Sequence, residues 1–222
     1  MIIDDKLIIE DKLRSIIDNT YFIGGSPCSG KSTIAEQLSK YYNLKYFKID
    51  DYEQAHIEEA SPERHPIMYK WSQLSWDKIW LRSVQKQVAE EFEFYRERFP
   101  MILSELEKFQ SAGRVITVSA ALLPELLKEL NLDKHRVIYL VPAKEFQVKH
   151  YSKRRFKDEI LEKCSQPEEA FKNWMERDHL FGRKVRDQAK EFGYKVIDVD
   201  GSRSIKENLK LVENHFRLSR KN

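Results

Sequence analysis

A glycine-rich segment near the beginning of the chain combines the residue types that hold a phosphate group. It consists of Gly25, Ser26, Pro27, Cys28, Ser29, Gly30, Lys31 and Ser32, which fit the pattern G-x-x-x-x-G-K-[ST] without substitution. The two glycines let the backbone wrap an anion so that successive N–H groups point at its oxygens, and a helix beginning near Lys31 adds its positive end. Lys31 would reach the β- and γ-phosphates of a nucleotide, and the Ser32 hydroxyl would ligate Mg²⁺. We therefore predict a nucleotide-binding loop that extends to Thr33.

Two adjacent carboxylates follow the second apolar run of the chain. Asp50 and Asp51 come directly after the strand predicted at residues 45–49. In a parallel sheet the carboxyl ends of the strands form the ligand crevice, so both side chains could face the phosphate loop. One carboxylate could accept the proton of a substrate hydroxyl while the other holds Mg²⁺, with Asp50 as the candidate metal ligand. An Asx-type turn after a strand is the alternative interpretation.

A basic segment late in the chain could supply further positive charge. It contains Lys149, His150, Lys153, Arg154, Arg155 and Lys157, and is followed by Arg177, Arg183 and Arg186. Arginine forks bind the equatorial oxygens of a transferring phosphoryl group, and a mobile segment would deliver them after the substrate binds. We expect Arg154 and Arg177 to have this role. A solvated helix face, or a surface that contacts RNA, is the alternative.

Strands and helices alternate along the chain, which predicts a parallel, three-layer α/β sheet. Apolar runs rich in β-branched and aromatic residues predict strands at residues 21–23, 45–49, 115–118, 137–141 and 195–199, and helical patterns cover residues 32–42, 124–130 and 204–216. The glycine-rich motif thus lies between a strand and an amphipathic helix. A plain glycine turn with an exposed lysine does not account for this context.

Two long segments interrupt the alternation. Residues 53–113 predict a helical insert with an apolar stripe formed by Trp76, Trp80, Val84, Val88, Phe92 and Tyr95, which we interpret mainly as a packing surface. Residues 144–178 predict a helical lid with a hinge at 164–167, followed by a returning helix. We expect residues 1–222 to form a single domain with these two additions.

The composition excludes several classes of protein. The chain has 222 residues, 41% hydrophobic and 34% charged, and a formal net charge of +3, too small for a general nucleic-acid clamp. Cys28 and Cys164 form neither a disulfide framework nor a zinc motif, which fits a cytoplasmic protein, and no run is apolar enough to span a membrane. Cys28 could be a redox-sensitive thiol, but a packing role is favoured. Nothing in the pattern specifies an oligomeric state.

Two classes of nucleotide hydrolase fit poorly. GTPases carry an N-K-x-D motif, whereas residues 131–134 have similar letters in the wrong order, and the D-x-x-G at 198–201 comes too late in the chain. Motor ATPases place an acidic pair after the third strand, where this chain has Val118 and Ser119. Hydrolysis is therefore not the expected reaction.

The loop at 25–32, the Asp50-Asp51-Tyr52 segment and the arginine-rich lid resemble the P-loop nucleoside and small-molecule kinases. The match covers most of the chain and is specific in the first fifty residues. It implies a five-stranded sheet of order 2-3-1-4-5, a substrate subdomain formed by the insert, and a lid over the phosphates. Val118-Ser119 departs from the pattern of some small kinases, in which a Glu-Gly pair precedes a segment like 120–124. The metal role then falls to Ser32 and Asp50 or Asp51.

These features together predict an ATP-dependent, Mg²⁺-dependent kinase that transfers the γ-phosphoryl group to a hydroxyl of a small molecule such as a nucleoside or sugar. The first alternative is a nucleotide kinase with a phosphate acceptor, for which Arg64, Arg82, Arg96 and Arg98 of the insert would provide cations. The second is a nucleotide-gated module that binds RNA or a protein.

Overall fold

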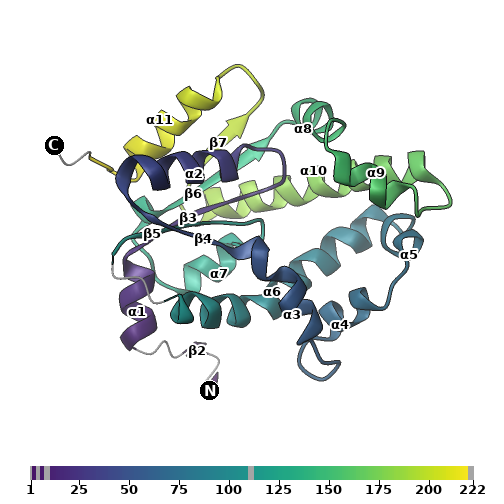
Figure 1. Cartoon of the computed structure of the whole chain (residues 1–222), viewed down its shortest axis with the longest axis horizontal. Helices are drawn as coiled ribbons and strands as arrows, with labels where there is room; N and C mark the ends of the chain where they lie inside the picture. The colour runs from purple at the N-terminus through teal and green to yellow at the C-terminus, as the bar shows by residue number, and fades with distance from the viewer. Residues whose placement is uncertain (1, 4–5, 8–10, 110–112, 220–222) are drawn as a thin grey trace.

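A five-stranded parallel sheet forms the centre of the computed structural model, which describes residues 2–3, 6–7, 11–109 and 113–219 (Figure 1). Residues 110–112, at the end of the predicted insert, lie outside this range. The strands are β3 (Thr20–Gly25), β4 (Lys45–Lys48), β5 (Val115–Val118), β6 (Val137–Pro142) and β7 (Lys195–Val199). They lie in the order β4-β5-β3-β6-β7, with all four pairs parallel. Counted along the chain this order is 2-3-1-4-5, as predicted. A separate antiparallel pair joins β1 (Ile2–Ile3) to β2 (Lys6–Leu7).

Helices cover both faces of the sheet, because its three central strands, β5, β3 and β6, are buried on both sides. On one face α2 (Lys31–Tyr42) and α11 (Ile205–His215) bury residues such as Leu38 and Val212. On the other face α1 (Asp11–Asp18), α6 (Val84–Lys108), α7 (Pro124–Glu129) and α10 (Pro167–Glu191) enclose a second core. The three-layer architecture predicted from the alternation is confirmed.

The insert between β4 and β5 is helical, as predicted. It begins with the 3₁₀ helix η1 (Ile49–Tyr52) and continues through α3 (Glu53–Glu58), α4 (Pro66–Ser72), α5 (Trp76–Trp80) and α6. The predicted apolar stripe is broken between α5 and α6, where the Gln87 side-chain amide donates to the Trp80 and Arg82 carbonyls at 3.2 and 2.9 Å. The Gln87 side chain thus satisfies the last carbonyl of α5 and one carbonyl of the link to α6.

The predicted lid consists of α8 (Lys144–Tyr151), α9 (Arg155–Leu161) and the first half of α10; a second 3₁₀ helix, η2 (Lys134–Arg136), precedes β6. Figure 1 shows α8 and α9 at the same end of the molecule as α4 and α5. The two segments share a small core of Trp80, Tyr151, Cys164, Ala170, Trp174 and Met175. The Ser165 N–H also donates to Asp77 at 2.8 Å. Insert and lid therefore pack together around one end of the sheet. In the described residues, no helix combines the length and apolarity needed to cross a membrane.

Candidate functional site

The glycine-rich loop follows β3 and leads into α2 with the backbone conformation that its glycines allow. Gly25 has φ 120° and Gly30 has φ 80°. A Cβ at Gly25 would lie 2.0 Å from the Leu140 carbonyl oxygen, so a side chain there is excluded by the neighbouring strand. Cys28 also adopts a positive φ of 64°. The loop thus curls at the N-terminus of α2, where helix N–H groups are free to receive an anion.

Lys31 is buried and turned back into the loop. Its Nζ donates to the Ser26 carbonyl oxygen at 2.5 Å and contacts the Ser29 Oγ at 3.3 Å. Burial lowers the pKa of Lys31 to about 8, although the nearby Asp50 carboxylate acts to raise it. A buried ammonium held by neutral oxygens is poorly compensated, so a phosphate group would be a more favourable partner.

A cavity of about 220 Å³, here called the phosphate cavity, gathers most of the predicted site. The loop residues Pro27 to Thr33 line one side of it, Asp50 and Ser119 line another, and Tyr151 and Arg154 come from the lid segment. Residues separated by more than one hundred positions in the sequence therefore meet at the carboxyl ends of the strands, where parallel sheets bind ligands.

Asp50 and Asp51 occupy different positions. Asp50 lines the phosphate cavity, and its Oδ1 accepts a hydrogen bond of 2.7 Å from the Ser119 Oγ. Asp51 lies along a neighbouring hollow of about 260 Å³ that it shares with Asp50, Ser32 and Lys48. At the strand end where the resemblance led us to expect a Glu-Gly pair, this chain has Val118 and Ser119, and the Ser119 hydroxyl orients the Asp50 carboxylate.

The two arginines predicted to act from the lid, Arg154 and Arg177, line different cavities. Arg154 lines the phosphate cavity, with its guanidinium 5.1 Å from the Tyr151 ring centroid. Arg177 lies in α10 and lines the adjacent cavity described below, where its Nη1 is 2.8 Å from Glu91 and its Nε is 2.7 Å from Asp178. Of the two arginines, Arg154 is thus the one positioned to approach a nucleotide phosphate.

Two residues hold this site in place in ways that the sequence did not indicate: Gly182 was not singled out, and Arg98 was considered only as a cation for an acceptor phosphate. Gly182 of α10 faces the loop, and a Cβ there would lie 2.7 Å from the Ser26 Oγ. Arg98 of α6 is fully buried and donates to the Ile49 carbonyl at 2.8 Å, to Glu53 at 2.6 Å and to His56 at 3.1 Å. Arg98 therefore fixes the turn that presents Asp50. The sequence shows that residue 98 is an arginine of the insert, but it gives no sign that this arginine is buried.

We expect Arg98→Met to lower the free energy of unfolding by about 3 kcal/mol, because it leaves Glu53 and the Ile49 carbonyl without their buried donor. For a chain of this length that loss corresponds to a fall in melting temperature of about 6–12 °C. The matched control is Arg96→Met on the same helix, where the arginine is 40% exposed and paired with Glu93 and Glu125. Equal losses in the two variants, measured by thermal and urea unfolding, would contradict the anchoring role of Arg98.

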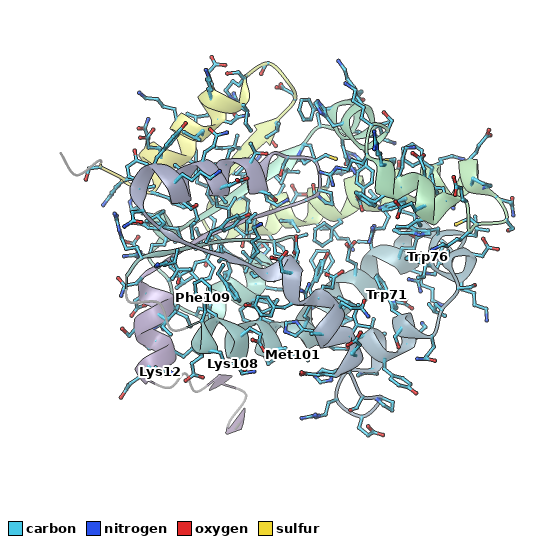
Figure 2. All side chains as sticks on the ribbon, viewed as in Figure 1. Lys12, Trp71, Trp76, Met101, Lys108 and Phe109 are labelled. Carbon is cyan, nitrogen blue, oxygen red and sulfur yellow. The ribbon has the colours of Figure 1, made fainter. Side chains whose placement is uncertain are left out.

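A second cavity of about 320 Å³, here called the aromatic cavity, adjoins the phosphate cavity. The two cavities share Pro27 and Tyr151 among their lining residues. The aromatic cavity is formed mainly by the insert and α10, and it is lined by Pro27, Glu53, Ile57, Trp71, Ser72, Trp76, Ile79, Trp80, Glu91, Phe94, Tyr95, Tyr151, Trp174 and Arg177. Figure 2 shows Trp71 of α4 and Trp76 of α5 on the same side of the molecule, among the insert helices. Part of the predicted stripe thus borders a cavity, while Val88 and Phe92 pack in the core.

The arginines of the insert are engaged elsewhere. Arg98 is buried against Glu53, Arg82 pairs with Glu90, and Arg96 pairs with Glu93 and Glu125. Arg64 is exposed. The described lining of the aromatic cavity includes none of these four residues.

The Cys28 thiol lies half-buried in the loop. Burial raises the pKa of Cys28 more than Arg154 and Lys31 lower it, so the protonated thiol is favoured. This supports the packing interpretation of Cys28 over the redox interpretation.

The oxygen donors near the loop fit a magnesium ion shared with a nucleotide. Ser32 and Asp50 line both the phosphate cavity and the neighbouring hollow. Mg²⁺ usually takes one or two protein oxygens together with phosphates and water. Across the described ranges, no group of three or more histidine, cysteine or acidic side chains could hold a metal by itself. The donor set therefore suits an ion that arrives with a phosphate ligand.

No protein-family model matches the chain, and no curated protein matches it. Solved structures with a similar fold include a sugar kinase from Janibacter sp., 15% identical, in an alignment that covers 90% of this chain and 95% of that one with a TM-score of 0.43. Shikimate kinase from Aquifex aeolicus is 21% identical over 89% of this chain and 96% of its own, with a TM-score of 0.37. An uncharacterized protein from Eubacterium ventriosum is 12% identical over 90% and 99%, with a TM-score of 0.42.

Proposed function

We propose that the chain is an ATP-dependent kinase that transfers the γ-phosphoryl group to a hydroxyl of a small molecule. The observation that carries the proposal is the junction of the phosphate cavity and the aromatic cavity at Pro27 and Tyr151. A nucleotide bound by the loop would direct its terminal phosphate to that junction. An acceptor in the aromatic cavity would meet it there, and such positioning is the main source of catalysis in phosphoryl transfer.

The proposed roles follow from the positions of the side chains. Lys31 and Arg154 would neutralise the charge that develops on the γ-phosphoryl oxygens, and Ser32 would help to hold Mg²⁺. As the acceptor oxygen bonds to the γ-phosphorus, the bond to the bridging oxygen of ADP breaks, and a carboxylate takes the hydroxyl proton. Asp50 is the better candidate for that carboxylate, because it lines the phosphate cavity beside Lys31.

A phosphate acceptor, as in a nucleotide kinase, is disfavoured by the charges around the aromatic cavity. An acceptor phosphate needs cations that are free to bind it. Arg177 is already paired with two carboxylates, and the insert arginines do not line the cavity. An acceptor hydroxyl has no such requirement.

A broad acceptor screen with γ-labelled ATP and Mg²⁺ tests the proposal. Nucleosides, sugars, amino alcohols and mononucleotides would be compared, with the Lys31→Ala variant as the blank. We expect label to appear on one or more hydroxyl compounds. Transfer to mononucleotides alone, with no loss in Asp50→Asn and Asp51→Asn, would contradict the hydroxyl assignment and favour a nucleotide kinase.

A further inference from the structure

The walls of the aromatic cavity favour flat or positively charged ligands. Half of its fourteen lining residues are aromatic, and they include all four tryptophans of the chain, Trp71, Trp76, Trp80 and Trp174. The rings of Trp80 and Trp174 are stacked with their centroids 4.1 Å apart. Aromatic faces carry partial negative charge, so they attract cations as well as other rings. The cavity thus offers an apolar body a large contact area and a cation an attractive wall.

The charged side chains at the cavity leave one negative charge in excess. The lining has two carboxylates, Glu53 and Glu91, and one arginine, Arg177. Two salt-bridge partners outside the lining, Arg98 and Asp178, carry opposite charges that cancel. The Arg177 guanidinium lies between Glu91 and Asp178 and 4.9 Å from the Trp80 ring centroid, so both its charge and its face are occupied. An anionic ligand would therefore meet net repulsion, whereas a monocation would balance the site.

Glu91 provides a specific acceptor for such a cation. Its residue is 5% exposed, and its Oε1 contacts the Tyr95 hydroxyl at 3.2 Å and Arg177 at 2.8 Å. Its Oε2 is buried without a hydrogen-bond partner among the residues that the structure describes. Burial raises the pKa of Glu91 to about 7, more than Arg177 lowers it, as expected for a carboxylate that lacks a sufficient counter-charge. A buried acceptor of this kind calls for a donor.

We propose that the aromatic cavity selects a hydroxylated amine, a compound that joins a protonated amino group and a free hydroxyl through an apolar or aromatic body. The ammonium donates to Glu91 Oε2, the body packs on the tryptophan rings, and the hydroxyl faces the junction with the phosphate cavity. This inference rests on the proposed function, because it identifies the cavity as the acceptor site.

Three matched benzyl alcohols test the charge preference: 4-(aminomethyl)benzyl alcohol as the cation, 4-methylbenzyl alcohol as the neutral compound and 4-(hydroxymethyl)benzoate as the anion. Binding is measured without nucleotide by quenching of tryptophan fluorescence, because every tryptophan of the chain lines the cavity. We expect the cation to bind about tenfold more tightly than the neutral compound, the difference made by one cation–aromatic or charged hydrogen-bond contact, and the anion to bind most weakly.

Two variants on α6 assign the preference to Glu91. Glu91→Gln should reduce the ratio of cation to neutral affinity to near one, whereas Glu93→Gln, with a side chain 52% exposed, should keep it. If Glu91→Gln fails to fold, the comparison of the three compounds on the unaltered chain decides. Equal or tighter binding of the anion, or no saturable quenching by the cation at millimolar concentration, overturns the proposal. If the chain binds the cation but transfers phosphate to no compound of the acceptor screen, the kinase assignment is wrong instead. The two failures are therefore distinguishable.

Discussion

Replacing Lys31 with alanine should reduce phosphoryl transfer by about 10²–10³-fold, because it removes the lysine of the loop that would hold the nucleotide. Lys31 is buried at the start of α2 and bonded to the Ser26 carbonyl. The folded state of the unliganded variant should be at least as stable at pH 7, since burial disfavours the charged lysine and alanine has no charge to desolvate. Activity and ATP affinity should therefore fall without a lower melting temperature.

Lys40→Ala is the matched control for this variant. Lys40 lies on the same helix, is 69% exposed and pairs with Glu36 on the surface, so its loss should leave transfer unchanged. ATP turnover in Lys31→Ala equal to that of the control would show that the motif is misinterpreted.

The pH dependence of ATP binding gives a second measure of the Lys31 role. Bound phosphates would raise the pKa of Lys31 above its unliganded value of about 8, so binding takes up a proton once the pH exceeds that value. ATP affinity should then decrease as the pH rises through 8, and Lys31→Ala should lose this decrease. Calorimetry in buffers of different ionisation enthalpy would detect the proton uptake.

The loop and the sheet could be predicted from the sequence because their signals are local. A strand, a motif of fixed spacing and an amphipathic helix occur in order between residues 20 and 42, and the strand boundaries at Val115–Val118 and Lys195–Val199 agree with the structure. Each strand is a short run of β-branched and aromatic residues, so its position depends little on distant contacts.

The aromatic cavity could not be predicted, because it is built by contacts across the chain. Trp80 of α5 stacks on Trp174 of α10, ninety-four positions later, and Glu91 of α6 meets Arg177. Arg154 and Arg177 both lie in a basic, helical part of the sequence, so the sequence does not distinguish their roles. Helical spacing cannot show which arginine already has carboxylate partners. The role expected for Arg177 at the transferring phosphate thus stays a prediction, and the structure places Arg177 in the lining of the aromatic cavity.

The same limit applied to the adjacent carboxylates of residues 50 and 51. The sequence places both at the end of a strand, but the 3₁₀ helix η1 turns successive side chains in different directions. Asp50 reaches the phosphate cavity and is held by Ser119, while Asp51 borders the neighbouring hollow. The local backbone geometry therefore gives the adjacent residues Asp50 and Asp51 different surroundings, which their identical chemistry cannot indicate.

Asp50→Asn should lower the rate of phosphoryl transfer by about 10²–10⁴-fold, the usual contribution of a positioned base, whereas Asp51→Asn should lower it less than tenfold. Asparagine keeps the shape of the side chain and can still accept the hydrogen bond from Ser119, so the fold should persist in both variants. The kinetic pattern distinguishes two roles. A base would affect kcat with little change in ATP affinity, whereas a metal ligand would raise the Mg²⁺ concentration needed for half-maximal rate. Each variant serves as the control for the other, since they differ by one position and carry the same change in charge. Losses of equal size would show that the division between the two cavities does not determine which carboxylate acts.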